Sequence, residues 1–310
     1  MTVQISFKKT VNEKSIKNYV LFSDENWKIY GLNSISLIKR SSSFISKLIK
    51  ENSNKKDKFL KFNLNSSQKI ILVKTKKTTT LDNERSGAEF YNFIKSNSIL
   101  SLTLLETNIK EIQPKNKNFL DEFLQGTQLK SYEFNKYKTK KKSKTVEINI
   151  SIKNKPSMLN KNNRFNSLIE GTNLTKDLVS EPGNILHPDE YAKRLMKLKK
   201  LGLKVTIYDK KKLKKLGMNA LLGVGQGSIR GSYLVTMEWN GTKSKTKPLA
   251  FIGKGVCFDT GGISLKPAKF MEDMTYDMAG SAVVVGLMKN FALRKAKINA
   301  VGVVGLVENM

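Results

Sequence analysis

A single segment, Gly253 to Met278, constrains this chain more than any other part of its sequence. It reads GKGVCFDTGGISLKPAKFMEDMTYDM, and in it two lysines, Lys254 and Lys266, alternate with two aspartates, Asp259 and Asp277. The apolar run around Lys254 predicts a buried strand, where an ammonium is costly unless something neutralises or binds it. A divalent metal would do this, because it takes an amine as the neutral base. The two aspartates would add hard oxygen ligands.

Each of these residues also has an ordinary explanation when it is taken alone. A lysine between glycines can reach solvent from a strand edge, and aspartate is common in turns. Together they favour a site. Asp259 ends the expected strand, where the chain turns at Thr260-Gly261-Gly262, and Asp277 begins the apolar helical stretch MAGSAVVVGLMKNFAL. Strand ends and helix starts meet at the carboxyl edge of an open α/β sheet, where such proteins bind ligands.

The segment resembles the first metal-binding signature of the leucine aminopeptidase (cytosol aminopeptidase) family, GKG-x-x-FD-[ST]-GG-x-x-x-KP followed by Asp-Met. The spacings match that pattern: five residues from Lys254 to Asp259, seven more to Lys266 and eleven more to Asp277. The resemblance implies two divalent metals, manganese or zinc with magnesium as an alternative. Lys254 and Asp277 would bind one metal, and Asp259 would bridge both. Lys266 would be the catalytic lysine that faces the substrate carbonyl oxygen, and Met271 would line the substrate pocket.

The resemblance to the family extends over most of the chain, but some segments match more closely than others. DLVSEPGNILHP (177–188) resembles the opening of the family's catalytic domain, with Ser180 where asparagine is usual. MNALLGVGQGS (218–228) resembles the next block, although its continuation departs from the expected form. DEFLQGTQLKSYEFNKYKTKKK (121–142) resembles the segment that closes the family's N-terminal domain. The first hundred residues match in general character only.

The family's second signature, Asn-Thr-Asp-Ala-Glu-Gly-Arg, does not occur before the chain stops at Glu308-Asn309-Met310. Two divalent cations carry four positive charges and the two aspartates only two negative ones, so further carboxylates are expected. Glu308 is expected to end a strand without a metal role. The chain therefore reads as a fragment cut within its catalytic domain. We expect it to be inactive and poorly soluble alone, because its final strand would leave an unpaired apolar sheet edge.

The numbers of histidines and cysteines limit the kinds of active site that this chain can contain. The chain has one histidine, His187, which excludes histidine zinc clusters and HExxH sites. Its one cysteine, Cys257, fits a reducing cytoplasm and is expected as a buried filler, with a nucleophilic thiol as the alternative. No run reaches the roughly 18 apolar residues of a membrane helix, and MTVQISFKKT lacks a signal-peptide core, so no membrane partner is expected.

The formal charge of +30 raises nucleic acid as an alternative partner. The lysines are spread along the chain, which favours compositional bias and a solvated face. The densest basic run holds the weak nucleic-acid candidates Lys138, Lys140, Lys141 and Lys142. The alternative function is accordingly a basic DNA-binding relative with an incomplete or vestigial peptidase site.

Hydrophobic patterning predicts two α/β domains with a linker between them. Residues 1–153 alternate short strands with helices, 154–166 form a polar linker that contains Pro156, and 167–310 form the first part of a catalytic domain. Near-continuous apolar strands in the second domain predict a central parallel or mixed sheet flanked by helices. The motif GVGQGSIRG (223–231) precedes a strand and not a helix, so it predicts a turn.

The family resemblance adds expectations that the residues alone do not supply. It implies that the N-terminal domain is macro-domain-like and that the catalytic domain is incomplete at its C-terminal end. It also implies peptide substrates with a free N-terminus, release of leucine-like residues, and a homo-oligomer, a hexamer, for the full-length protein.

Overall fold

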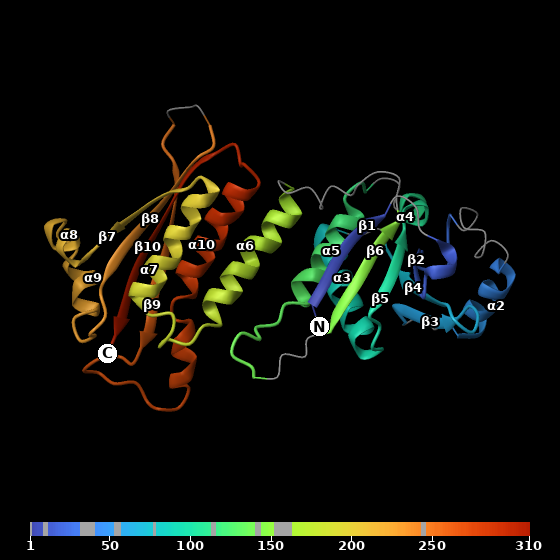
Figure 1. The fold of residues 1–310 in the computed structure, drawn as a ribbon, viewed down its shortest axis with the longest axis horizontal. Helices are drawn as coiled ribbons and strands as arrows, with labels where there is room; N and C mark the ends of the chain where they lie inside the picture. Colours follow the sequence, from blue (N-terminus) through green and yellow to red (C-terminus); the bar gives the residue numbers. More distant parts are fainter. Residues whose placement is uncertain are drawn as a thin grey trace. The chain divides into compact units, whose positions relative to one another are not determined.

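A computed structural model describes residues 2–8, 12–31, 41–52, 57–76, 79–112, 116–139, 144–151, 163–242 and 246–310. The chain divides into two compact units, Met1–Asn160 and Lys161–Met310 (Figure 1). Each unit contains a sheet with helices packed against it, so the predicted mixed α/β class is confirmed. No helix in the described part of the chain has the length and apolar character needed to cross a bilayer.

The described part of the first unit contains a six-stranded sheet in the order β1-β6-β5-β2-β4-β3. Neighbouring strands are parallel except β3, which runs antiparallel to β4 at the edge. The strands are β1 (Thr2–Lys8), β2 (Asn18–Ser23), β3 (Phe59–Asn63), β4 (Lys69–Lys74), β5 (Ser101–Leu105) and β6 (Thr145–Ser151). Short connections and helices link them: η1 (Glu13–Ser15), α2 (Ser42–Asn52), α3 (Thr80–Ser96), α4 (Glu106–Ile112) and α5 (Phe119–Lys130).

Alternation along β2 divides its side chains between the two faces of this sheet. Phe22 packs edge-on against Phe119 and Phe123 of α5, with ring centroids 5.1 and 5.2 Å apart. Leu21, one position earlier, belongs instead to the buried cluster that contains Ile45 of α2. Apolar side chains therefore cover both faces of the first sheet.

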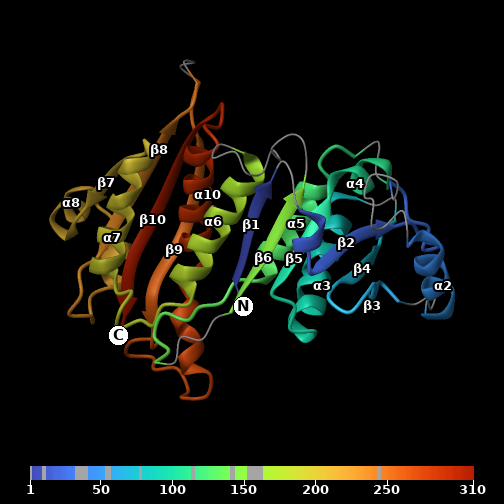
Figure 2. The same cartoon turned by 45° about the vertical axis from the view of Figure 1, so that its right-hand side comes forward.

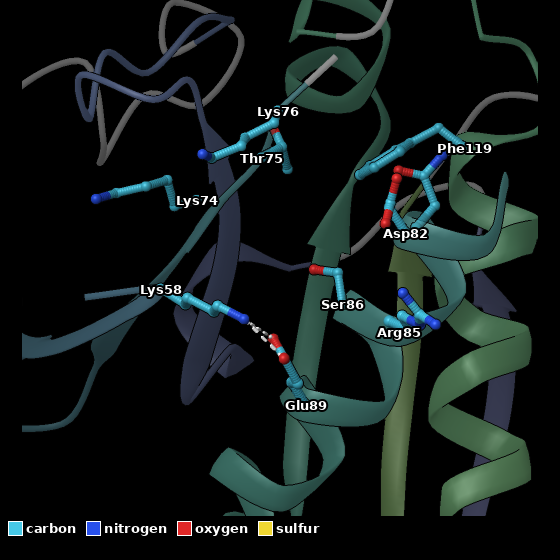
Figure 3. A pocket seen from close by; sticks show the side chains of 10 residues that line it. Lys58, Lys74, Thr75, Lys76, Asp82, Arg85, Ser86, Glu89 and Phe119 are labelled. Carbon is cyan, nitrogen blue, oxygen red and sulfur yellow. Dashed lines mark hydrogen bonds and ion pairs between the residues drawn. The ribbon is translucent and has the colours of Figure 1, made fainter. Parts of the chain in front are cut away.

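A pocket of about 430 Å³ opens between the end of β4 and the first turns of α3 (Figure 3). Its basic residues have acidic neighbours. Lys58 donates to Glu89 at 2.7 Å, as Figure 3 shows, and Lys76 lies 3.8 Å from Glu25. Its lining residues are Lys58, Lys74, Thr75, Lys76, Asp82, Asn83, Arg85, Ser86, Glu89 and Phe119.

The described part of the second unit contains a four-stranded mixed sheet in the order β7-β8-β10-β9. The strands are β7 (Lys204–Tyr208), β8 (Tyr233–Asn240), β9 (Leu249–Asp259) and β10 (Asn299–Asn309). β8 runs antiparallel to both of its neighbours, whereas β9 and β10 run parallel. β10 is thus an inner strand, and β9 has a ladder partner on one side only among the described residues.

Helices cover both faces of the second sheet (Figure 2). A Cβ on Gly302 would lie 2.8 Å from Met288 of α10, and one on Gly305 would lie 3.1 Å from Leu221 of α9. Successive residues of a strand point to alternate faces, so Gly302 and Gly305, three positions apart, point to opposite faces. The helices α10 and α9 therefore lie on opposite sides of the sheet. The elements are α6 (Arg164–Val179), α7 (Pro188–Met196), η4 (Lys197–Leu201), α8 (Lys210–Lys215), α9 (Asn219–Val224), η5 (Met271–Tyr276) and α10 (Ala279–Leu293).

Some local predictions need correction. The expected unpaired edge at the final strand is wrong, because β10 lies between β8 and β9. Thr79 caps α3, and Asp82 completes the capping box from the third helical position. Of the predicted linker, 154–162 lie outside the described residues, and Arg164 already begins α6.

Candidate metal centre

Asp259 is the last residue of β9, as predicted, and its carboxylate is held from several directions. Its Oδ1 accepts hydrogen bonds from the Gly261 N–H at 2.9 Å and from the Asn309 amide at 2.7 Å. Its Oδ2 lies 2.8 Å from Nζ of Lys266. Partial burial raises the pKa of Asp259, but Lys266, Gly261 and Asn309 outweigh this effect and lower the pKa to about 2. Asp259 is therefore a carboxylate throughout the neutral range.

The turn after Asp259 brings Lys266 back to it. Gly261 has φ +94° and a Cβ there would lie 2.2 Å from the Ser264 carbonyl oxygen, so this position requires glycine. The Lys266 N–H then donates to the Thr260 carbonyl at 2.8 Å and closes the loop. The side chain of Lys266 contacts both Asp259 and, at 3.0 Å, the Met274 sulfur of η5. Two residues that lie seven positions apart in the sequence thus meet at one strand end.

Lys254 and Asp277 form the second ion pair of the region. They meet because α10 starts close against β9: a Cβ on Gly253 would lie 2.6 Å from Cα of Ser281. Asp277 is the C-cap of η5 and lies two residues before the first residue of α10, Ala279. One of its carboxylate oxygens faces Lys254, while the other, Oδ2, is buried with no hydrogen-bond partner among the described residues. A buried carboxylate oxygen without a partner is costly and is suited to a cation.

The four predicted residues therefore occur as two lysine–aspartate pairs linked through η5. Lys266 contacts Met274, and the Asp277 N–H donates to the carbonyl of that same methionine at 3.3 Å. Oxygen and amine donors of this kind fit a hard or borderline divalent metal. The unpartnered oxygen of Asp277 would be one ligand of that metal. Among the described residues, no group of three or more histidine, cysteine, aspartate and glutamate side chains could hold a metal. A metal at this place would therefore need ligands besides the described carboxylates, and Lys254 is the predicted one.

The assumption that Lys254 is a buried ammonium is wrong. Its side chain is 58% exposed, because β9 lies at the edge of the described sheet. The unpartnered carboxylate oxygen of Asp277 therefore favours a bound metal, whereas desolvation of Lys254 does not.

Other predicted residues lie around this centre. Met271 begins η5 and is half-buried, but Met274 is the methionine that contacts Lys266. Cys257 is 1% exposed, and burial raises the pKa of its thiol far above the ordinary value, which fits a filler. Lys138 is exposed, and Lys140, Lys141 and Lys142 lie outside the described residues.

A pocket of about 690 Å³ borders the strand ends of this region. Phe258 and Glu308 contribute to it from β9 and β10, and Glu272 and Thr275 contribute from η5. Met271 is not among its lining residues. Glu308, the residue before the end of β10, accepts a 2.6 Å hydrogen bond from Ser228.

Asn309 was not among the residues that the sequence singled out. Its amide contacts Asp259 only because β9 and β10 are neighbours, and nothing in the local pattern predicts that pairing. The signal available in the sequence was the Glu-Asn-Met motif at the end of an apolar strand, which does not indicate what the asparagine contacts.

Comparison with known proteins identifies the family. Residues 173–310 match the cytosol aminopeptidase family, catalytic domain. A probable cytosol aminopeptidase from Brucella ovis is 45% identical over 254 residues, which cover 78% of this chain and 50% of that protein. The chain thus spans about half the length of the curated relatives it matches.

Solved structures show the same fold at lower identity. The cytosol aminopeptidase of Coxiella burnetii aligns with a TM-score of 0.76 at 19% identity, over 99% of this chain and 61% of that one. The bottromycin maturation enzyme BotP in complex with Mn aligns with a TM-score of 0.73 at 18% identity, over 96% and 60%. By its sequence relatives, this chain belongs to the cytosol aminopeptidase family.

Proposed function

We propose that the protein carrying this chain is a metal-dependent aminopeptidase that releases leucine-like residues from the N-terminus of peptides. The observation that carries the proposal is the pairing of Lys254 with Asp277, whose second carboxylate oxygen is buried without a partner. A divalent cation would satisfy that oxygen. Membership of the family supplies the reaction class.

The proposed cofactor is a pair of divalent ions, manganese or zinc, with magnesium as the alternative. Lys254 and Asp277 would hold one ion and Asp259 would bridge both. Manganese receives support from the BotP structure, which was solved with Mn. When bound, such ions polarise a carbonyl and lower the pKa of an attacking water. Because two carboxylates cannot neutralise two divalent ions, further acidic ligands are expected outside the described residues.

Lys266 is proposed to stabilise the oxyanion that develops on the scissile carbonyl. Its ammonium lies at the end of β9 and is held by Asp259 at 2.8 Å and Met274 at 3.0 Å, so it is already oriented before substrate arrives. A preoriented cation stabilises developing negative charge without reorganisation. Met271 is proposed to contact the N-terminal side chain, with weak discrimination, because one methylene contributes only about 1–3 kcal/mol.

The family also supports a set of proposals about the whole protein. Its partners would be peptides with a free N-terminus, it would assemble as a homohexamer, and it would work in the cytoplasm. The relatives are named cytosol aminopeptidases, which supports the last of these.

The test is hydrolysis of leucyl-4-nitroanilide by the full-length gene product with added Mn²⁺ or Zn²⁺. We expect Lys266→Ala to lower kcat by roughly a hundredfold or more, because an oxyanion-stabilising group is lost. The bound metal content should stay close to that of the parent protein. Lys269→Ala is the matched control, since Lys269 is exposed on the same loop and stacks on Phe270. An unchanged kcat in Lys266→Ala removes Lys266 from the mechanism, and no hydrolysis by the parent protein with either metal contradicts the function.

A further inference from the structure

A bulge places Asn309 opposite Asp259. β9 and β10 run in register as far as the pair Val307 and Val256, and the next pair is Asn309 with Asp259. Three steps along β9 therefore match two along β10, which is the geometry of a β-bulge. Bulges change the direction of side chains. Here Asn309 is directed to Asp259, while the preceding Glu308 is buried and bonds to Ser228.

The contact between the two side chains has one chemical orientation. A carboxylate can only accept, so the asparagine must present its NH₂ group. Nδ2 of Asn309 donates to Oδ1 of Asp259 at 2.7 Å, and the Gly261 N–H donates to the same oxygen at 2.9 Å. Two neutral donors thus hold Oδ1, and Oδ2 faces the ammonium of Lys266 at 2.8 Å. The neutral donors fix the plane of the carboxylate independently of Lys266.

Asn309 is itself fixed by the turn that follows Asp259. The main-chain carbonyl oxygen of Asn309 accepts hydrogen bonds from the Thr260 N–H at 2.9 Å and from the Thr260 hydroxyl at 3.1 Å. Gly262 has φ +69°, and a Cβ there would lie 2.9 Å from Oδ1 of Asn309. A glycine at 262 therefore satisfies the left-handed backbone and also leaves room for the amide.

From this geometry we propose that Asn309 is a positioning residue, which orients the Asp259 carboxylate as a metal ligand. The inference rests on the proposed function, because it concerns the same metal centre. Groups that hydrogen-bond to a metal ligand fix its orientation, and their loss weakens metal affinity by about 10–100-fold. Asn309 would act through Asp259 and would not contact the metal or the substrate.

The test uses the full-length gene product and Mn²⁺ alone, with free Mn²⁺ measured by electron paramagnetic resonance. Asn309→Leu keeps the size of the side chain but removes the donor. We expect it to weaken Mn²⁺ binding by about 10–100-fold and to change the line shape of the bound ion, at an unchanged melting temperature of the metal-free chain. Asn309→Ala, which removes the donor without adding bulk, should give the same loss.

Ser228→Ala is the matched control, because it removes the hydrogen bond to the neighbouring Glu308 and leaves Asp259 untouched. It should keep the parent affinity and line shape. Parent-like Mn²⁺ binding in both Asn309 variants overturns the positioning role while leaving the proposed function intact. An equal loss in Ser228→Ala also overturns it, since the effect would then come from the strand end in general. Absence of Mn²⁺ binding by the full-length parent protein overturns both proposals.

Discussion

Arg194 joins two acidic residues in the second unit. It donates to Glu181 at 2.7 Å and to Glu190, one helical turn earlier in α7, at 2.9 Å. Glu181 is 3% exposed, and the guanidinium of Arg194 compensates its negative charge. Glu181 lies in the loop that runs from α6 to α7, and the next residues, Pro182 and Gly183, line the pocket beside the metal centre. The ion pair therefore stabilises the fold and also anchors the loop whose next residues line the pocket.

We expect Arg194→Leu to lower the free energy of unfolding by about 3–5 kcal/mol, because it leaves a buried carboxylate without its cation. The comparison is Lys204→Ala, which removes a largely exposed ion pair with Glu238 at 3.2 Å and should cost no more than about 1 kcal/mol. Urea unfolding followed by circular dichroism measures both. Equal costs for the two variants would show that Arg194 does not compensate a buried charge.

At the residue scale, the sequence could indicate Lys254, Asp259, Lys266 and Asp277 because their identity and spacing follow a signature. It could not indicate their partners. The unpartnered oxygen of Asp277 follows from the approach of α10 to β9, and the contact of Asn309 follows from a bulge. Both depend on which strands and helices are neighbours, and local pattern does not contain that information.

At the scale of elements, helices in each unit cross at glycines. A Cβ on Gly87 of α3 would lie 1.8 Å from the Phe123 carbonyl oxygen of α5, and one on Gly126 would lie 1.8 Å from the Glu84 carbonyl oxygen. In the second unit, Gly171 of α6 and Gly286 of α10 meet in the same way, at 2.5 and 2.6 Å. Such backbone contact leaves no room for a methyl group.

We expect Gly87→Ala to destabilise the chain by about 1–3 kcal/mol or more, since two helix backbones must separate to admit the methyl group. Gly223→Ala is the control: it lies in α9 with nothing within 4 Å of the added Cβ, so it should be neutral or slightly stabilising. Thermal unfolding compares the two variants. A melting temperature for Gly87→Ala at or above that of the parent would contradict the close crossing.

Periodicity predicts many of the elements, and several have no clear periodic signal. The apolar alternation of 146–151 and the helical spacing around Phe90 correspond to β6 and α3. The short strand β3 was not predicted, because five residues with one buried side chain give little signal. The stretch before Asp277 was likewise not assigned, and it forms η5, which links the two ion pairs.

At the scale of the whole molecule, strand order decides where the candidate centre lies. β9 and β10 are parallel neighbours, so their ends meet and bring Asp259 beside Asn309. The sequence predicts the existence of these strands, whereas the inner place of β10 and the edge place of β9 arise from long-range pairing. This is why the expectation of an unpaired final strand and that of a buried Lys254 were both wrong.

The central claim is that Lys254, Asp259 and Asp277 hold divalent metal. The most direct measurement is anomalous scattering from crystals of the full-length protein soaked in Mn²⁺. The account predicts anomalous density beside the carboxylates of Asp259 and Asp277, with the Lys254 amine released from its ion pair. Crystals that diffract well after soaking but show no anomalous density next to these side chains would contradict it.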